Sequence, residues 1–312
     1  MAIHFTVSER QQLAALVALR VSKIAIARRL QRAPSTIFRE LKRNCGDTGY
    51  QAGSAQQQAV MRHTHRHRKM DSPEVAEYVK SRLELRWSPD QIDGRTRRDF
   101  LDDRLRRISR QTIYNWLKQP AGSEHRQYLR FYREKPPLRR RVDPAQTLPN
   151  RPAIIGRRER FGDWEGDTLV GRKGISKPVL YSIVERVSGY LELARGENRE
   201  ADTANRILRR RLNQYPPNWL QSCTFDNGAE FAKVGELESV LQIEVYHTQP
   251  YKAWQRGTNE NTNGLIRQYF PKGTDFQQVS QAELTTAESQ LNTRPRKRLG
   301  YQTPQELKNK YC

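Results

Sequence analysis

The stretch GDWEGDTLVGRKGISKPVLYSIVERVSGYLELA at residues 162–194 decides the fold of this chain. It holds three runs rich in β-branched and aromatic residues, separated by Gly, Pro and Ser, a pattern typical of consecutive strands. We place these strands at 163–170, 179–187 and 190–194. Beyond them, helical and strand-like patterns alternate, which indicates a mixed α/β sheet. The further elements expected are a helix at 201–214, a strand at 222–226, a helix around 231–241, a strand at 243–248 and a helix at 258–270.

At the N-terminus, residues 1–45 predict a unit of three short helices. Thr6 and Glu9 have the spacing of a capping box, and Pro34 suits the first position of the third helix. That helix is apolar on one side and polar and basic on the other, which is typical of a helix-turn-helix that reads a DNA major groove. A plain three-helix bundle is the alternative. The residues expected to face DNA are Ser35, Thr36, Arg39 and Arg43.

A second unit of the same kind is predicted at 72–119. Ser72 and Ser88 each stand directly before a proline, and Ser109 opens a third helix, so three helix starts are marked. The third helix again has one apolar and one polar side. A packing or dimerisation bundle is the alternative to a second DNA-binding unit. The residues expected to face DNA here are Arg110, Gln111, Tyr114 and Asn115.

The charge of the chain is large and unevenly placed. Its 312 residues include 56 Lys and Arg against 34 Asp and Glu, a formal net charge of +22. Residues 1–160 alone hold 35 basic and 16 acidic side chains. Such an asymmetry indicates a polyanion, because each neutralised phosphate releases condensed counterions. We therefore expect double-stranded DNA as a partner, with a solvated basic surface as the alternative.

Two basic connectors separate the predicted units, at 46–71 and 120–160. The first contains His63, His65 and His67, but their spacing is not that of a zinc site, and we interpret them as phosphate-facing charge. The second is rich in Pro and Arg and predicts an extended strap along a phosphate backbone. The basic run at 294–298 is interpreted as a further phosphate contact.

Several function classes are excluded by composition. The three cysteines lie far apart in the sequence, so neither a disulfide framework nor a zinc ribbon is expected. No apolar run approaches the ~20 residues that a membrane span needs, and no secretory signal opens the chain. The sequence therefore predicts a cytoplasmic protein without a membrane partner.

Three acidic residues of the predicted core lie on or directly after its strands and helices. Asp167 lies in the first strand, Asp226 ends the strand at 222–226, and Glu260 lies in the first turn of the last helix. Carboxylates gathered in this way could hold a pair of Mg²⁺ ions for phosphoryl transfer. Alternatively, Asp226 belongs to a turn, Glu260 complements a helix dipole and Asp167 is a surface residue. The residues alone leave both interpretations open.

Longer segments carry a likeness to a known family. In the N-terminal half they are HFT at 4–6, PSTIFRELKRN at 34–44, WSPDQI at 87–92 and TIY at 112–114. In the C-terminal half they are GDWEGDTLVG at 162–171, TFDNGAEF at 224–231, WQRGTNENTNGLIRQYFPKGTDF at 254–276 and LNTRPRKRLGYQTP at 291–304. In these segments the chain resembles the transposases of the insertion-sequence-30 family, over nearly its whole length.

The resemblance implies a fold and a site. The fold is a multidomain chain, with N-terminal all-α helix-turn-helix modules before an α/β ribonuclease-H-like, integrase-type catalytic core with a mixed sheet. Asp167, Asp226 and Glu260 then take the catalytic and metal-ligand roles; 33 residues separate the last two, a spacing known in this family's triad. Two Mg²⁺ ions are expected, with Mn²⁺ as a substitute. Because Asp163, Glu165 and Asp167 alternate along one strand and share a face, Glu165 is the reserve candidate for the first ligand.

Residues around the triad are further candidates for DNA contact. Asn263 and Arg267 follow Glu260 on the same side of the predicted helix and could hold a phosphate. Lys252, Trp254 and Arg256 precede that helix in a loop suited to stacking on a strand end. Each of these side chains could instead serve packing or solvation.

The predicted organisation follows from these segments. It comprises a helix-turn-helix DNA-binding domain at 1–45, a basic linker at 46–71, a second helix-turn-helix-like DNA-binding domain at 72–119, a Pro- and Arg-rich linker at 120–160, and a catalytic core with a helical tail at 161–312. The resemblance implies a bacterial, nucleoid-associated transposase. It would bind terminal inverted repeats and target DNA as a homodimer or higher multimer, and catalyse metal-dependent strand cleavage and strand transfer. A helix-turn-helix repressor without catalysis and a structure-specific nuclease without strand transfer are the alternatives.

Overall fold

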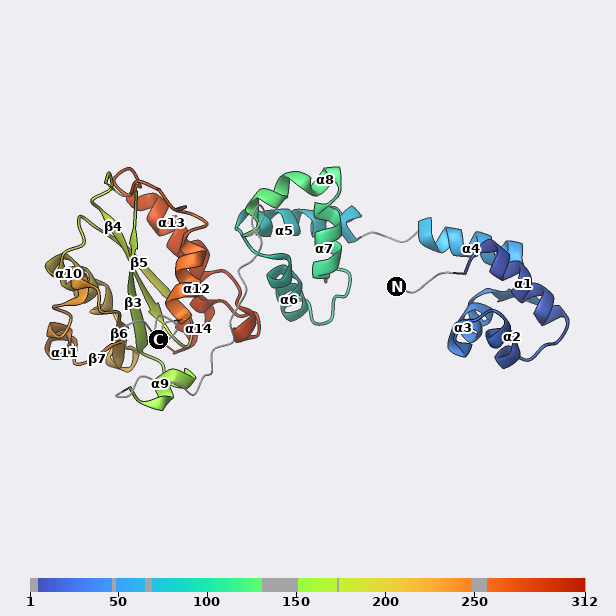
Figure 1. Ribbon diagram of the computed structural model, residues 1–312, viewed down its shortest axis with the longest axis horizontal. Coiled ribbons are helices and arrows are strands. Elements are labelled where there is room, and N and C mark those ends of the chain that lie inside the picture. The colour runs from blue at the N-terminus through green and yellow to red at the C-terminus, as the bar shows by residue number, and fades with distance from the viewer. Residues whose placement is uncertain are drawn as a thin grey trace. The chain divides into compact units, whose positions relative to one another are not determined.

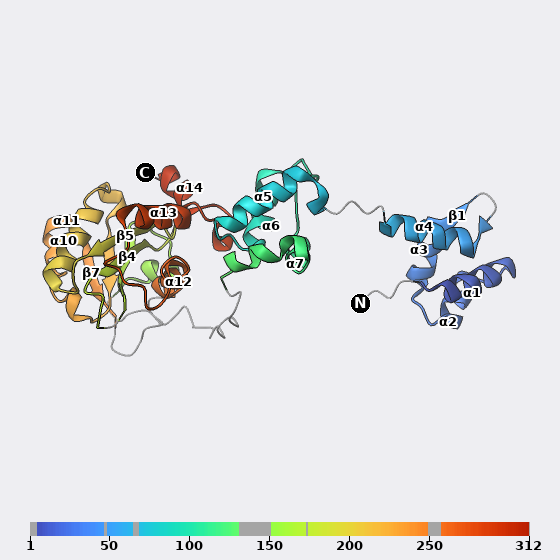
Figure 2. The ribbon, with the colours of Figure 1, turned by 90° about the horizontal axis from the view of Figure 1, so that it is seen from above.

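The computed structural model describes residues 5–46, 49–64, 69–130, 151–172, 174–248 and 257–311. Its chain divides into two compact units, Met1–Asp71 and Ser72–Cys312. Figures 1 and 2 show the elements of each unit. No helix in the described ranges is long and apolar enough to span a lipid bilayer.

The first unit is built on three helices whose starts follow the expected signals. They are α1 (Val7–Ala18), α2 (Lys23–Arg29) and α3 (Pro34–Asn44). Thr6 and Glu9 form the predicted capping box on α1, and Pro34 is the first residue of α3, so these predictions are confirmed. The apolar sides of the helices meet in one core that includes Leu13, Ile26 and Ile37.

A fourth helix, α4 (Ala52–Thr64), completes this unit, where the sequence predicts a linker. The short strands β1 (Cys45–Gly46) and β2 (Gly49–Tyr50) lead into it. The buried guanidinium of Arg10 joins α1 to α3 and α4: it pairs with Glu40 at 2.8 Å and donates to Gln56 at 2.7 Å. The side chains of His63, His65 and His67 lie outside the described residues.

The second unit opens with helices inside the segment 72–119. They are α5 (Pro73–Glu84), α6 (Pro89–Asp99) and α7 (Arg110–Leu117), followed by α8 (Pro120–Ser123) and a 3-10 turn at Glu124–Tyr128 (Figure 1). Ser88 and Gln91 form the expected capping box on α6, and the hydroxyl of Ser109 caps α7 by accepting from the N–H of Thr112 at 3.2 Å. Fully buried apolar residues join the helices: Val79, Leu83, Ile92 and Ile113.

A mixed five-stranded sheet forms the centre of the rest of this unit (Figure 1). Its strands are β3 (Asp163–Val170), β4 (Val179–Glu185), β5 (Leu191–Gly196), β6 (Ser222–Phe225) and β7 (Glu244–His247). They lie in the order β5-β4-β3-β6-β7. The neighbours β5, β4 and β3 are antiparallel, whereas β6 is parallel to β3 and β7 to β6. The predicted mixed sheet is confirmed, and this strand order is that of a ribonuclease-H-like core.

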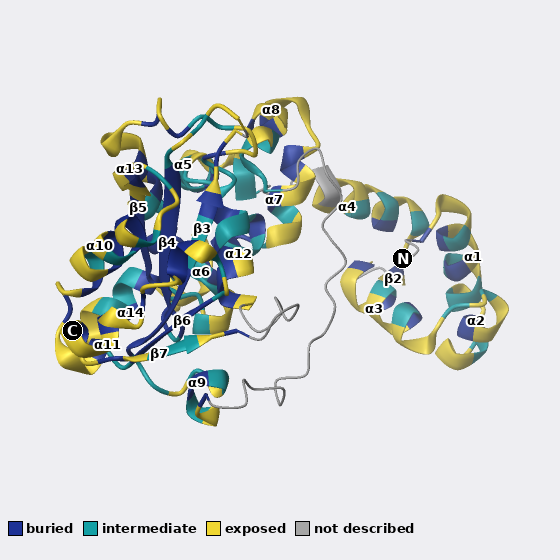
Figure 3. Ribbon diagram, turned by 60° about the vertical axis from the view of Figure 1, so that its left-hand side comes forward, coloured by how far each residue is buried: buried dark blue, intermediate teal, exposed yellow. Residues whose placement is uncertain are grey.

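Helices cover both faces of the sheet, and its central strands are therefore buried (Figures 1 and 3). α10 (Ala201–Leu212) and α11 (Glu236–Leu241) pack with one core, which includes Trp164, Ile183 and Phe225. α12 (Gly257–Ile266) and α13 (Gln281–Asn292) pack with the other, which includes Leu169 and Val184. α9 (Ala153–Arg157) precedes the sheet, and α14 (Pro304–Tyr311) follows α13.

Gly166 on β3 packs against a buried ring, and this close approach gives a stability prediction. A Cβ at 166 would lie 2.3 Å from Cε1 of Phe225, which is fully buried and belongs to the core beneath the strand. We expect Gly166→Ala to lower the free energy of unfolding by about 1–3 kcal/mol, as overpacking of a core does. Denaturant unfolding measures it, with Gly235→Ala as the control, because a Cβ there meets nothing within 4 Å. Equal stability of the two variants would contradict the packing argument.

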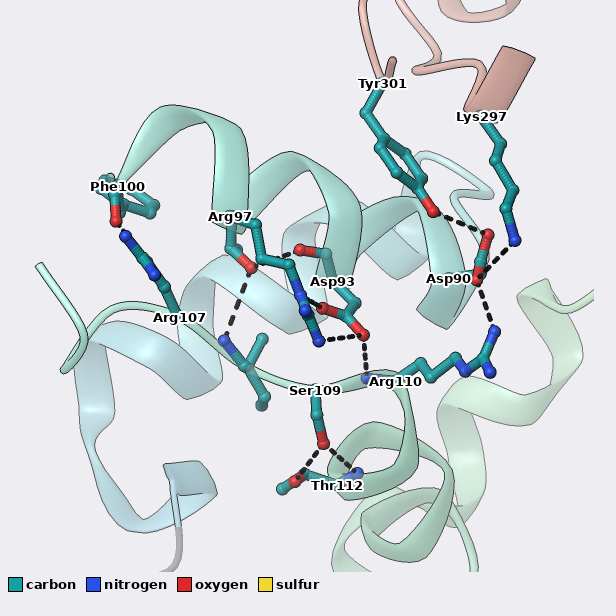
Figure 4. A network of polar contacts seen from close by, with 12 residues as sticks. Asp90, Asp93, Arg97, Phe100, Arg107, Ser109, Arg110, Thr112, Lys297 and Tyr301 are labelled. Carbon is teal, nitrogen blue, oxygen red and sulfur yellow. Dashed lines mark hydrogen bonds and ion pairs between the residues drawn. The ribbon is translucent and has the colours of Figure 1, made fainter. Parts of the chain in front are cut away.

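The loop and turn before α14 pack against α6 and join the helical part of the second unit to the sheet part (Figure 4). The hydroxyl of Tyr301 donates to Asp90 at 3.4 Å, and the same carboxylate accepts from Arg110 of α7 at 2.9 Å. Gly94 of α6 lies directly under the Tyr301 ring, since a Cβ there would fall 2.2 Å from it. This contact fixes α6 and α7 to the part of the unit that contains the sheet.

Arg294 is the buried centre of the same interface. Only 3% of it is exposed, and its guanidinium donates to Gln91 of α6 at 2.9 Å and to Gln268 after α12 at 2.8 Å. The interpretation of 294–298 as a phosphate contact is therefore wrong for Arg294. Its guanidinium is buried, and its hydrogen bonds are made to the side-chain amide oxygens of Gln91 and Gln268.

The pairing of Glu306 with Arg95 gives a pH prediction for this interface. Two hydrogen bonds, at 2.8 and 2.7 Å, join the groups, and this pairing holds the pKa of Glu306 below its ordinary value. A lowered pKa contributes stability above the unfolded-state value, about 4.3, and the contribution is lost as pH falls through the folded-state value. We expect the melting temperature of Glu306→Gln to fall less than that of wild type on acidification from about pH 6 to about pH 3. Parallel curves for the two proteins would contradict this.

Candidate active site

The register of two parallel strands relates two of the three candidate carboxylates. In the β3–β6 ladder Asp163 pairs with Ser222 and Glu165 with Thr224. Asp167 and Asp226 each lie two residues beyond the last of these pairs. Neighbouring strands lie about 4.8 Å apart, so we expect the two aspartates to lie near each other just past this ladder.

Hydrogen bonds fix the carboxylate of Asp167. Its Oδ1 accepts from the N–H of Thr168 at 2.9 Å, and its Oδ2 accepts from the side-chain amide of Asn263 at 2.6 Å. The carbonyl oxygen of that amide accepts from the hydroxyl of Ser182 on β4 at 2.9 Å. Asn263 therefore connects α12 to both β3 and β4 at the level of Asp167.

The third candidate, Glu260, lies in the first turn of α12 and is exposed. Asn263 follows it by three residues, which places both side chains on the same face of the helix. The hydrogen bond of Asn263 to Asp167 therefore attaches α12 to β3 one turn after Glu260. The helix begins at Gly257, one residue before the predicted start, and the hydroxyl of Thr258 accepts from Arg158 at 3.0 Å.

The oxygen donors of this region suit a hard divalent cation. Asp167 and Asp226 offer carboxylates from adjacent strands, and Glu260 offers a third from α12. Among the described residues, no three acidic, His or Cys side chains stand close enough to hold an ion as they are. Mg²⁺ keeps several waters and needs only one or two protein carboxylates. Two neighbouring carboxylates with a third on the adjoining helix therefore fit such an ion.

Glu165, the reserve candidate, lies inside the protein and away from solvent. It is fully buried and forms an ion pair with Arg186, which follows β4. Its Oε2 also accepts from the N–H of Asn259 in the first turn of α12 at 3.1 Å. Arg186 donates to the carbonyl of Ile155 at 3.1 Å, and burial lowers the pKa of Arg186 to about 9, so it remains charged at neutral pH. Glu165 is thus engaged between β3, Arg186 and α12.

Asp163, the other acid on this face of β3, is also engaged within the protein. It is 1% exposed, and its carboxylate accepts from Arg160 at 2.8 Å and from the hydroxyl of Ser222 at 2.7 Å. Of the three alternating acids, Asp167 alone is partly accessible to solvent. The difference in burial favours Asp167 as the metal ligand.

A basic pocket of about 340 Å³ opens beside the end of β3. Arg267 lines it and donates to the carbonyl of Val170 at 2.8 Å, and burial lowers the pKa of Arg267. The other lining residues are Gly171, Arg172, Lys272 and Gly273. Lys252, Trp254 and Arg256 lie outside the described residues.

The proposed reading faces of the helical units are open to solvent. On α3, Ser35, Arg39 and Arg43 are exposed and Thr36 is half-buried. On α7 the four expected residues are all exposed: Arg110, Gln111, Tyr114 and Asn115. Arg110 carries its ion pair with Asp90, and the amide of Gln111 donates to Asn115 at 2.9 Å. DNA contact by these side chains stays a prediction.

Sequence reasoning missed Ser182 and Arg186 at this site. Ser182 is fully buried in the apolar strand β4, and the bonds it makes explain why a polar residue stands there. A serine within the run VLYSIVE was the available signal. The partner of Arg186 was not visible in sequence, because Glu165 lies on another strand.

Comparisons with known proteins show which family the chain resembles. Residues 4–44 match the model of a helix-turn-helix domain. The chain is 36% identical to the transposase for insertion sequence element IS4351 of Bacteroides fragilis, over 98% of this chain and 95% of that protein. It is 35% identical to the transposase InsI for insertion sequence element IS30A of Escherichia coli (strain K12), over 97% of this chain and 83% of that protein.

Among solved structures, the catalytic core domain of BIV integrase covers 48% of this chain and 99% of its own, with 21% identity and a TM-score of 0.37. The classification rests on the full-length relatives and the matched helix-turn-helix, which reproduce the resemblance seen in the sequence. The chain belongs to the IS30 family of insertion-sequence transposases.

Proposed function

We propose that the protein binds the terminal inverted repeats of its insertion sequence and cuts and joins DNA at a divalent-metal site made by Asp167, Asp226 and Glu260. The observation that supports this is the register of β3 and β6, in which Glu165 pairs with Thr224 and each aspartate lies two residues further along the chain. The helix with Glu260 is bonded to the same place through Asn263.

Each residue of the site has a role that follows from its position. Asp167 and Asp226 would hold one ion between adjacent strands, and Glu260 would add a carboxylate from α12. Two Mg²⁺ ions, with Mn²⁺ as a substitute, would activate the attacking water or 3′-OH and stabilise the leaving oxygen. Asn263 restrains the rotamer of Asp167, so that this carboxylate is oriented before DNA arrives.

The helical units would supply affinity and sequence reading. α3 presents a polar and basic face of the kind that enters a major groove. α7 presents a second face and is fixed to the part of the chain that contains the sheet, so DNA bound there would have a defined place relative to the strands. We propose action as a homodimer or higher multimer on bacterial nucleoid DNA in the cytoplasm, because two element ends must be joined to one target.

Two alternative functions would make a different use of the part of the chain that contains the sheet. A helix-turn-helix repressor would not need the carboxylates of Asp167 and Asp226. A structure-specific nuclease would cut DNA without joining it. The full-length similarity to transposases favours cutting and joining over both.

Strand transfer is the activity that separates these functions. We expect the purified full chain to join pre-cut terminal-repeat duplexes, taken from the repeats that flank its gene, to a plasmid target in Mg²⁺. The reason is that a 3′-OH replaces water as the nucleophile at the same carboxylates. Covalent product is measured on a denaturing gel, and Ca²⁺ in place of Mg²⁺ is the control. Cleavage of uncut ends without any joined product would favour the nuclease.

A further inference from the structure

Glu165 and Arg186 form a buried ion pair, and its contribution to folding stability does not explain why charged residues stand at these two positions. Glu165 is 0% exposed and Arg186 is 4% exposed. Removing two charges from water costs several kcal/mol per ion, and an apolar pair of similar size is often as stable. A role in addition to stability is therefore expected of the pair.

The pair touches the catalytic region at one point, the first turn of α12. The N–H groups there have no partner within the helix, and a carboxylate that accepts from them also complements the helix dipole. Glu165 accepts from the N–H of Asn259 at 3.1 Å. Arg186 holds Glu165 in place from the side of β4, through the ion pair and through its own bond to Ile155.

This contact lies one residue before Glu260. A second hydrogen bond of the same helix to the sheet, from Asn263 to Asp167, lies three residues after Glu260. A helical segment held on both sides of a residue cannot rotate or slide at that residue without breaking one of the two contacts. Glu165 and Asn263 thus hold the backbone of α12 to β3 on both sides of Glu260.

We propose that Glu165, held by Arg186, is a positioning residue that fixes the first turn of α12 so that Glu260 completes the metal site. This inference rests on the proposed function, in which Glu260 is a ligand. Glu165 acts through the backbone of α12, and the feature that matters is its hydrogen-bond acceptor. Its charge matters less, because Arg186 neutralises it within the protein.

Two neutral double variants separate the acceptor from the charge. In Glu165→Gln/Arg186→Gln, the amide oxygen at 165 can still accept from Asn259, and the amide at 186 can donate to Ile155. In Glu165→Leu/Arg186→Met, the pair becomes apolar at similar volume, which proteins tolerate, and the acceptor is lost. Mn²⁺ affinity of the full chain on pre-cut terminal-repeat DNA is measured by electron paramagnetic resonance of the free ion.

We expect the Gln/Gln variant to bind Mn²⁺ within about threefold of wild type, and the Leu/Met variant to bind about 10–100-fold more weakly, as loss of an outer hydrogen bond at a metal site does. Glu185→Gln is the matched control. Glu185 is also a fully buried glutamate of this sheet, but it accepts from Val187 at 3.1 Å and Ser188 at 2.6 Å, in the turn after β4. The Glu185→Gln substitution should lower the melting temperature and leave the Mn²⁺ affinity unchanged. Equal affinities of the two double variants would overturn the proposal.

The same measurement on a Glu260→Gln protein distinguishes failure of this inference from failure of the proposed function. Glu260→Gln should weaken Mn²⁺ binding by itself, and adding Glu165→Leu/Arg186→Met should weaken it no further, because the positioned ligand is already absent. Additive losses would show that Glu165 does not act through Glu260. Unchanged Mn²⁺ binding in Glu260→Gln alone would contradict the metal site, whatever Glu165 does.

Discussion

Replacing Asp226 by Asn will abolish strand cleavage while leaving DNA binding intact. The amide keeps the size of the side chain and the acceptor for the N–H of Gly228, which lies 2.9 Å from Oδ1. It removes the negative charge that a divalent ion requires. Loss of metal-assisted charge stabilisation, worth several kcal/mol, corresponds to a rate about three orders of magnitude lower. Single-turnover cleavage of terminal-repeat DNA in Mg²⁺ measures the effect.

Asp202→Asn is the control for this substitution. Asp202 is exposed on α10 and pairs with Lys233 at 2.5 Å, on the face of the sheet opposite to α12. The Asp202→Asn variant should cleave DNA at the wild-type rate. If Asp226→Asn cleaves DNA in Mg²⁺ at the wild-type rate, Asp226 is not a metal ligand. The register of β3 and β6 would then no longer support the proposed site.

The second large effect is expected on the reading face of α3. Replacing Arg39 and Arg43 together by Ala removes two cations from that face. Each contact of this type is worth about 1–3 kcal/mol, so the dissociation constant for terminal-repeat DNA should rise by about 30-fold or more. If both residues contact phosphates, the slope of log K against log salt should become shallower by roughly 2. Fluorescence anisotropy at several salt concentrations measures both quantities.

A charge-matched variant on the core tests whether net charge alone explains such a loss. Arg206 and Lys233 are exposed basic residues of the sheet part, on the α10 side, and their replacement by Ala removes the same two charges. Affinity should change little, since neither residue lies on a reading helix. Equal weakening by the two double variants would indicate a diffuse electrostatic effect and would contradict a specific role of α3.

Much of the fold could be predicted from the sequence, because its signals are local. The strand at 163–170 was expected where β3 is found, since its pattern lies in a continuous run between glycines. The starts of α1 and α6 were visible as capping boxes, which need only residues three positions apart. α4 was missed because the core residue that it contributes is a single alanine, Ala55, in a stretch rich in Gln.

For the candidate site, too, the sequence indicated the residues but not the contacts between distant parts of the chain. Asp167, Asp226 and Glu260 were named from the sequence because the family resemblance marks them. The bond from Asn263 to Asp167 joins residues 96 positions apart, and no periodicity indicates which atom an amide will meet. Asn263 was predicted as a DNA contact, and its amide is instead engaged with Asp167 and Ser182. Its contact with DNA stays a prediction.

The choice among the three acids of β3 also depended on tertiary contacts. Alternation along the strand shows that Asp163, Glu165 and Asp167 share a face, and it cannot show what covers each of them. The ion pair with Arg186 and the bond to α12 bury Glu165, which excludes solvent from that carboxylate. Burial by a distant segment is the kind of information that a single sequence does not contain.

In the proposed site, Asp167, Asp226 and Glu260 meet around a divalent ion. Anomalous diffraction from crystals of the full chain with pre-cut terminal-repeat DNA and Mn²⁺ would locate that ion. We expect an anomalous peak between the carboxylates of Asp167 and Asp226, with a carboxylate oxygen of Glu260 in the coordination sphere. Manganese bound elsewhere on the protein, with Glu260 still turned to solvent beside an ordered DNA end, would contradict it.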